Sequence, residues 1–349
     1  MGYTAEILDD VRRQIAPEDL VLKEARERRE TIKAIAGSYH GVTRCYSSGS
    51  LAHGTANCPI HLRDKGLDAD CGVVLDRRVH PTLGPDSVAD EGPCRVSEEF
   101  VAYLRPRVRN EYPHARLKLT KRAVFVQVNE PMADGEDPTI DVVLGLQRRK
   151  NGLWIPNTET DRWDPSHPEM HTALLTADPQ QLRVTRARAI RLAKAENKRT
   201  SRPPLCSFNI EAFGLMFVAA GMDVSQALLT LWSQGAADLE RRLTPDPAGV
   251  SRPIKVQDRK VAVQRLENAA RRLRAALAND DNEAVVRQHL HALWPDYVAT
   301  SRHESTKARI AAALKSKRAL SVGTGGALTT GAGEPLKTTR SFGDRRSSL

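Results

Sequence analysis

The chain has 349 residues and a formal net charge of +10. Its apolar and charged fractions are ordinary for a globular protein, and its length allows two lobes with buried cores. The longest apolar stretch, around residues 213–220, is too short to span a membrane, and residues 1–10 lack the zones of a signal peptide, so we expect a cytoplasmic protein with no membrane partner.

The first half of the chain predicts a mixture of helices and strands. Residues 4–36 have apolar side chains near helical spacing, broken at Pro17. A strand over residues 42–47 runs directly into Gly49 and Ser50. A helix over residues 96–110 is expected to be interrupted or to end near Pro106. The further strands are predicted at residues 67–75, 115–120, 123–128 and 139–146, the last of them closing the lobe.

Beyond Trp163 strand patterns give way to helical periodicity. The predicted helices cover residues 179–197, 208–220, 224–243, 256–277 and 282–294. The expected fold class is therefore α+β and bilobal, with a mixed-sheet catalytic lobe and N-terminal helix at 1–165 packed on an all-helical lobe at 166–320. Residues 321–349 are rich in Gly, Thr and Ser without apolar periodicity, which predicts a disordered basic tail.

The positive charge is concentrated near the C-terminus. Residues 301–349 hold ten Lys or Arg against three acidic residues, which leaves only about +3 for the rest of the chain. The basic run from Arg105 to Arg122 straddles a predicted helix and two strands, and we interpret it as solvated surface rather than a nucleic-acid ledge. The five cysteines form no CxxC pair and no zinc spacing, so we expect reduced thiols.

Three carboxylates carry the candidate chemistry. Successive side chains alternate across a strand, so Asp68 and Asp70 project from one face about 7 Å apart. Asp141 is a lone carboxylate on an apolar strand, which is unfavourable unless the group is paired or binds metal. Oxygen ligands of this kind suit Mg²⁺ or Mn²⁺, and we predict two ions held by the three aspartates. Gly49 and Ser50 open a turn whose backbone amides and hydroxyl suit a phosphate.

These pieces resemble the polymerase-β-type nucleotidyltransferase superfamily and, within it, the cGAS/DncV-like nucleotidyltransferases (CD-NTases). Residues 49–55, Gly-Ser-Leu-Ala-His-Gly-Thr, are similar to the family's glycine-serine motif, and residues 67–75 to its metal-binding strand. The runs 189–194 and 205–211 resemble its central helix with a triphosphate-binding lysine, followed by a serine that starts the next helix. The resemblance implies that Lys194 and Ser207 hold phosphate oxygens.

The resemblance also implies an activity. CD-NTases join nucleoside triphosphates, here ATP, GTP or pyrimidine nucleotides, into a cyclic di- or oligonucleotide second messenger with release of pyrophosphate, in bacterial anti-phage defence (CBASS). CBASS regulatory or effector proteins are then expected partners, and nucleic acid is a weakly supported one. Two alternatives stay open at this point: a nucleotidyltransferase toxin that modifies tRNA or a protein, and a catalytically silent nucleotide or RNA sensor.

Overall fold

The computed structural model describes residues 2–58, 67–132 and 135–300, and the backbone of three short strands nearer the C-terminus. The chain divides into two compact units, residues 1–298 and 299–349. In the second unit the described strands β8 (Ser321–Val322), β9 (Leu328–Thr329) and β10 (Glu334–Pro335) pair antiparallel in the order β10-β8-β9. The rest of the tail for which disorder was predicted lies outside the described residues.

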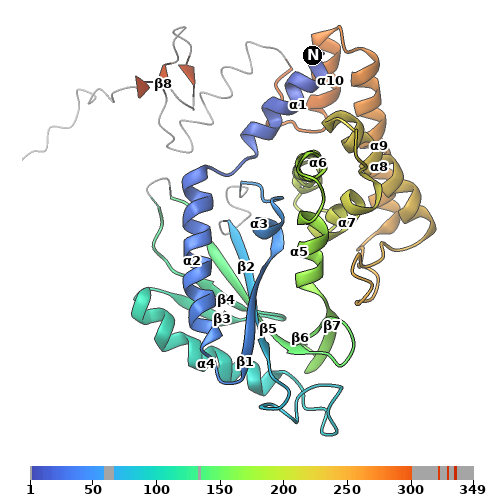
Figure 1. The fold of residues 1–349 in the computed structure, drawn as a ribbon. Helices are drawn as coiled ribbons and strands as arrows, with labels where there is room; N and C mark the ends of the chain where they lie inside the picture. Colours follow the sequence, from blue (N-terminus) through green and yellow to red (C-terminus); the bar gives the residue numbers. More distant parts are fainter. Residues whose placement is uncertain are drawn as a thin grey trace, which may run out of the picture. The chain divides into compact units, whose positions relative to one another are not determined.

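A mixed sheet organises the first half of the chain (Figure 1). Its strands lie in the order β1-β2-β5-β4-β3, and β2 and β5 are parallel whereas the other neighbours are antiparallel. The predicted α+β fold class with a mixed sheet is confirmed, and each predicted strand is present to within one or two residues. The strands are β1 (Val42–Ser48), β2 (Asp68–Leu75), β3 (Arg116–Leu119), β4 (Val124–Gln127) and β5 (Thr139–Gln147).

Two helices, α2 (Asp19–Gly37) and α4 (Cys94–Glu111), pack against this sheet. Both share one hydrophobic cluster with the inward side chains of β2, β4 and β5. In α2 the buried apolar residues recur at helical spacing, as in the series Val21, Ala25, Ile32 and Ala36. This packing holds β2 and β5, the strands that carry the three aspartates, in the middle of the lobe.

Helix α4 continues through Pro106, so the predicted interruption or end near that residue is wrong. A proline inside a helix removes one hydrogen bond and typically costs about 3 kcal/mol. Phe100 and Leu104 before the proline and Val108 after it are fully buried. Burial of this continuous apolar stripe on the sheet outweighs the cost of the proline.

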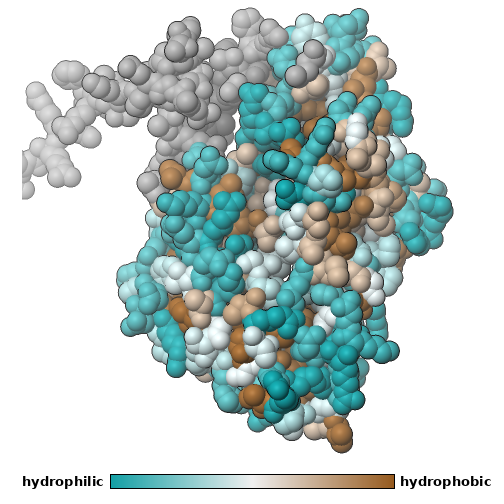
Figure 2. Space-filling model, in the orientation of Figure 1, coloured by the Kyte–Doolittle hydropathy of each residue, from teal (hydrophilic) through white to brown (hydrophobic). Residues whose placement is uncertain are grey.

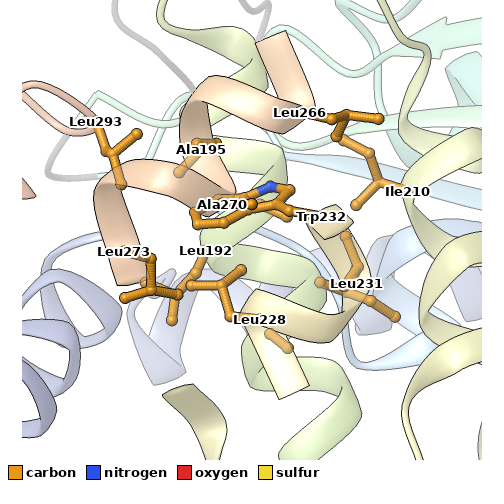
Figure 3. Packing of buried hydrophobic residues seen from close by; sticks show 14 of the residues in the cluster. Leu192, Ala195, Ile210, Leu228, Leu231, Trp232, Leu266, Ala270, Leu273 and Leu293 are labelled. Atoms are coloured by element: carbon orange, nitrogen blue, oxygen red, sulfur yellow. The ribbon is translucent and has the colours of Figure 1, made fainter. Parts of the chain in front are cut away.

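The second half of the described chain is helical, as predicted. Its apolar core also includes the buried residues of α1 (Tyr3–Gln14), which the sequence analysis grouped with the first lobe. Figure 3 shows Trp232 at the centre of this core, surrounded by Leu192, Leu228 and Leu273. The helices are α6 (Gln180–Lys198), α7 (Ser207–Phe217), α8 (Val224–Arg241), α9 (Arg259–Ala278) and α10 (Glu283–His291).

The structure adds three elements that the sequence analysis missed. Strands β6 (Leu153–Asn157) and β7 (Arg162–Ser166) form an antiparallel hairpin that extends the sheet from β5, so residues 139–146 are not the last strand. The short helix α5 (Pro168–Thr176) follows directly. Each strand of the hairpin contains a proline, which weakens a strand prediction. For α5 a signal was present, because proline is favoured in the first turn of a helix.

Hydrophilic residues predominate around the outline of the face shown in Figure 2, and hydrophobic residues show mainly nearer its middle. Among the described residues, every helix is too short or too polar to cross a membrane.

Candidate active site

The three predicted aspartates converge at one place in the sheet. Strands β2 and β5 pair in parallel with Asp70 opposite Asp141 and Asp68 opposite Thr139. One carboxylate oxygen from each of Asp68, Asp70 and Asp141 lies within 4.8 Å of the other two. The Thr139 hydroxyl donates a hydrogen bond to Asp68 Oδ1 over 3.3 Å. A triad that the sequence placed on two separate strands is therefore a single acidic cluster.

The electrostatics of the cluster favour a bound cation. Burial, followed by the charges of Asp68, Asp141 and Glu211, raises the pKa of Asp70 to about 8. Burial also raises the pKa of Asp141, and the Oδ1 atom of that residue is buried with no hydrogen-bond partner among the described residues. Oxygen ligands with unmet acceptor capacity and mutual repulsion fit a hard divalent cation such as Mg²⁺ or Mn²⁺.

Gly49 lies directly against the cluster. It begins the short helix α3 (Gly49–His53), and its φ of +72° is a conformation that favours glycine. A Cβ atom on this residue would lie 1.6 Å from Asp70 Oδ2. Ser48, the residue before it, is paired with Asp70 across β1 and β2. Only glycine allows the turn to approach the carboxylate so closely.

A cavity of about 600 Å³ opens beside the cluster and is walled by both halves of the chain. This volume falls in the range of small-molecule sites. The sheet side contributes Gly49, Ser50, Asp68 and Asp70 to the lining. The helical side contributes Lys194 and Ser207. Six of the seven predicted site residues thus line one cavity, and the seventh, Asp141, adjoins it through Asp70.

Lys194 does not project into this cavity as an isolated cation. Its Nζ donates to Glu211 Oε1 over 2.6 Å, and the two side chains are only 5% and 7% exposed. Glu211, on α7, was missed in the sequence, although it lies within the run 205–211 quoted for the resemblance. Burial by itself would raise its pKa, but Lys194 and His53 outweigh that effect and lower it. Glu211 is therefore an anion in the cavity wall.

A histidine in the wall was also missed. His171 Nε2 lies 2.6 Å from Asp246 Oδ1, and the Asp246 carboxylate also accepts the backbone N–H groups of Ala248, Val250 and Ser251. Burial opposes ionisation of Asp246, but the contacts from His171 and the backbone lower its pKa. An ionised Asp246 only accepts, so Nε2 of His171 carries the proton. No local motif marks this pair, because its members lie on α5 and in a distant loop.

Two further side chains line the cavity and bring an aromatic face and a cation. Phe208 is half-buried and belongs to none of the described hydrophobic clusters. The centroid of its ring lies 4.7 Å from the centroid of the His171 ring. Arg122, which the sequence analysis interpreted as solvated, lines the cavity and donates to Asp164 Oδ2 over 2.6 Å. An aromatic face and a guanidinium beside carboxylates are the components of a site for a charged, planar ligand.

No family model and no curated protein matches the sequence. Solved structures do match it. CdnG, a CD-NTase of Bradyrhizobium diazoefficiens in complex with GTP, is similar with a TM-score of 0.62 and 16% identity over 83% of this chain and 95% of that chain. CdnC of E. coli MS115-1 with ATP is similar with a TM-score of 0.59 and 18% identity over 86% of this chain and 99% of that chain.

A third structure, the Vibrio cholerae DncV cyclic AMP-GMP synthase in complex with the linear intermediate 5′ pppA(3′,5′)pG, is similar with a TM-score of 0.55 and 12% identity over 85% of this chain and 87% of that chain. The matches span both halves of the chain. The protein therefore has the fold of the cGAS/DncV-like nucleotidyltransferases, as the sequence motifs predicted.

Proposed function

We propose that the protein is a metal-dependent nucleotidyltransferase that joins nucleoside triphosphates into a cyclic di- or oligonucleotide and releases pyrophosphate. One observation carries the proposal: Asp68, Asp70 and Asp141 converge beside a cavity that also holds the Gly49–Ser50 turn. The fold supports it, because the similar structures include a cyclic AMP-GMP synthase and proteins in complex with GTP or ATP.

In this proposal the aspartates hold two divalent cations, Mg²⁺ or Mn²⁺. When bound, such ions activate the attacking hydroxyl and stabilise the leaving pyrophosphate. Asp68 and Asp70 are close enough to bind the same ions, whereas Asp141 faces Asp70 from the neighbouring strand and would bind the ion on the side of the nucleophile. Burial raises the pKa of Asp70 and Asp141, so keeping both ionised beside Asp68 is costly without a cation, and this argues against a catalytically silent sensor.

The remaining cavity residues suit the other parts of a nucleoside triphosphate. Ser50 and Ser207 present hydroxyl donors for phosphate oxygens, and Lys194 presents a cation. Phe208 offers an aromatic face on which a base can stack, and stacking requires no base-specific hydrogen bond. One cavity thus combines carboxylates that can bind metal ions, donors that can bind phosphate oxygens and an aromatic ring on which a base can stack.

A cyclic product distinguishes the preferred function from transfer to tRNA or a protein, since the same three aspartates serve either reaction. The biological role we propose is bacterial anti-phage signalling. The CdnC:HORMA-deltaN complex, a structure similar to this chain with a TM-score of 0.57, makes a protein partner the first kind to seek. Such a partner and a cytoplasmic location are parts of the proposal.

The test is an incubation of the purified protein with four α-labelled nucleoside triphosphates and Mg²⁺ or Mn²⁺, followed by phosphatase treatment and separation. We expect a phosphatase-resistant small product that is absent from the Asp68→Ala/Asp70→Ala variant. Label that appears only in added tRNA or in protein would replace this function with macromolecular transfer. Binding of metal and triphosphate without any pyrophosphate release would indicate a sensor.

A further inference from the structure

Every donor of the Lys194 ammonium is already engaged. An ammonium has three N–H donors. Nζ lies 2.6 Å from Glu211 Oε1, 3.0 Å from Thr55 Oγ1 and 3.4 Å from the Thr55 carbonyl oxygen. A phosphate oxygen can therefore bind Lys194 only by displacing one of these acceptors.

Glu211 is the centre of the same contacts. Its Oε1 accepts a second hydrogen bond from Thr55 Oγ1 over 2.6 Å, and its Oε2 lies 3.1 Å from His53 Nδ1. The other nitrogen of His53 lies 3.1 Å from Thr172 Oγ1. We call His53, Thr55, Thr172, Lys194 and Glu211 the Lys194 network. It joins the end of the Gly49–Ser50 turn to α5, α6 and α7.

The position of the Glu211 charge affects triphosphate binding more than the number of contacts that Glu211 makes. A phosphate oxygen that reaches Nζ comes near the carboxylate that lies 2.6 Å from the same nitrogen. In a sheltered site the repulsion between two such anions is weakly screened. Glu211 therefore reduces the attraction of Lys194 for a triphosphate whichever of the three acceptors is displaced.

Resting on the proposed function, we propose that Glu211 is a positioning residue that competes with the triphosphate for Lys194. In the nucleotide-free protein it compensates a buried cation, which would otherwise be costly. In the complex it weakens the hold on the triphosphate and on the pyrophosphate product. Glu211 thereby lowers the affinity for the triphosphate and speeds the release of pyrophosphate. A variant without the charge should bind the triphosphate more tightly and turn over more slowly.

The direction of this effect separates the proposal from a structural role. Loss of a residue that only maintains the fold weakens ligand binding. Loss of a competitor strengthens it. We expect Glu211→Gln to bind the Mg²⁺ complexes of α,β-methylene nucleoside triphosphates about tenfold more tightly than the wild type, measured by titration calorimetry. KM and kcat should fall together in the labelled-nucleotide assay.

Two controls isolate the interaction. In a Lys194→Met background the same Glu211→Gln change should alter affinity by less than about twofold, because the group for which Glu211 competes is gone. Glu196→Gln removes another buried carboxylate, one that pairs with Arg199 and Arg265 outside the cavity, and should leave affinity unchanged.

Glu211→Asp covers the case in which the Gln variant does not fold. It keeps the buried charge but withdraws it from Nζ by one methylene, and we expect about twofold tighter binding. Affinity equal to or weaker than the wild type in the folded variants overturns the proposal. The four analogues carry adenine, guanine, cytosine or uracil. If the wild type binds none of them, the proposed function fails and this inference fails with it.

Discussion

Substitution of Gly49 by alanine tests the contact between the glycine-serine turn and the acidic cluster. The new Cβ atom would lie 1.6 Å from Asp70 Oδ2 and 2.4 Å from its Cγ. No side chain tolerates such an approach, so either Asp70 or the turn must move by an ångström or more. Misplacement of a catalytic group by about 1 Å can cost roughly 10²-fold in rate.

The chain supplies a matched control at Gly54. Gly49 and Gly54 have φ values of +72° and +70°, but a Cβ atom on Gly54 meets nothing within 4 Å. The left-handed conformation costs an alanine about 1–2 kcal/mol, partly offset by about 0.4–1 kcal/mol from the stiffer unfolded chain. The backbone should therefore cost each variant about 1 kcal/mol in the free energy of unfolding, and only Gly49→Ala should lose more through the contact with Asp70.

The assay is pyrophosphate release, run beside urea unfolding of the same preparations. We expect Gly49→Ala to lose about 10²-fold or more in kcat and Gly54→Ala to stay within about threefold of the wild type. Activity close to the wild type in both variants would show that the approach of Gly49 to Asp70 has no catalytic consequence, and an equal loss of activity in both would assign the effect to backbone strain instead.

Three further predictions follow from the charges and the core. Because the pKa of Asp70 is raised to about 8, above the ordinary value of 3.8, the folded protein retains a proton that the unfolded chain has lost between these two pH values. Metal-free stability should fall as the pH rises through this window, and Mg²⁺ should raise the melting temperature more at pH 8 than at pH 6; an Asp70→Asn variant that keeps the same pH dependence would contradict this. Asp141→Asn removes the charge of a half-buried carboxylate whose Oδ1 atom has no hydrogen-bond partner among the described residues, so it should raise the metal-free melting temperature while lowering kcat by about 10²-fold or more; a lower melting temperature would refute the reasoning. Trp232→Ala should cost about 3–5 kcal/mol in urea unfolding, because the ring is 1% exposed at the centre of the helical core; a loss below about 1 kcal/mol would show that the core repacks.

Elements with strong local periodicity could be predicted from the sequence. The alternation of Val124 and Val126 in β4 and the helical spacing in α2 are short-range patterns that follow directly from backbone geometry. The β6–β7 hairpin was missed because Pro156 and Pro165 interrupt the local pattern. The end of α4 was misplaced near Pro106 for the opposite reason, since burial against the sheet overrides a local penalty.

The sequence by itself determined which residue types stand at the site and on which elements: two aspartates in alternation on one strand, a third on another, and a glycine-serine turn after a strand. Only the tertiary structure decided which side chains contact one another at the site. The register that sets Asp70 opposite Asp141, the Lys194–Glu211 ion pair and the His171–Asp246 contact all join segments far apart in the chain. Local preferences act over a few residues, whereas these contacts depend on how strands align and how the helices dock, and that is settled by burial of the whole core.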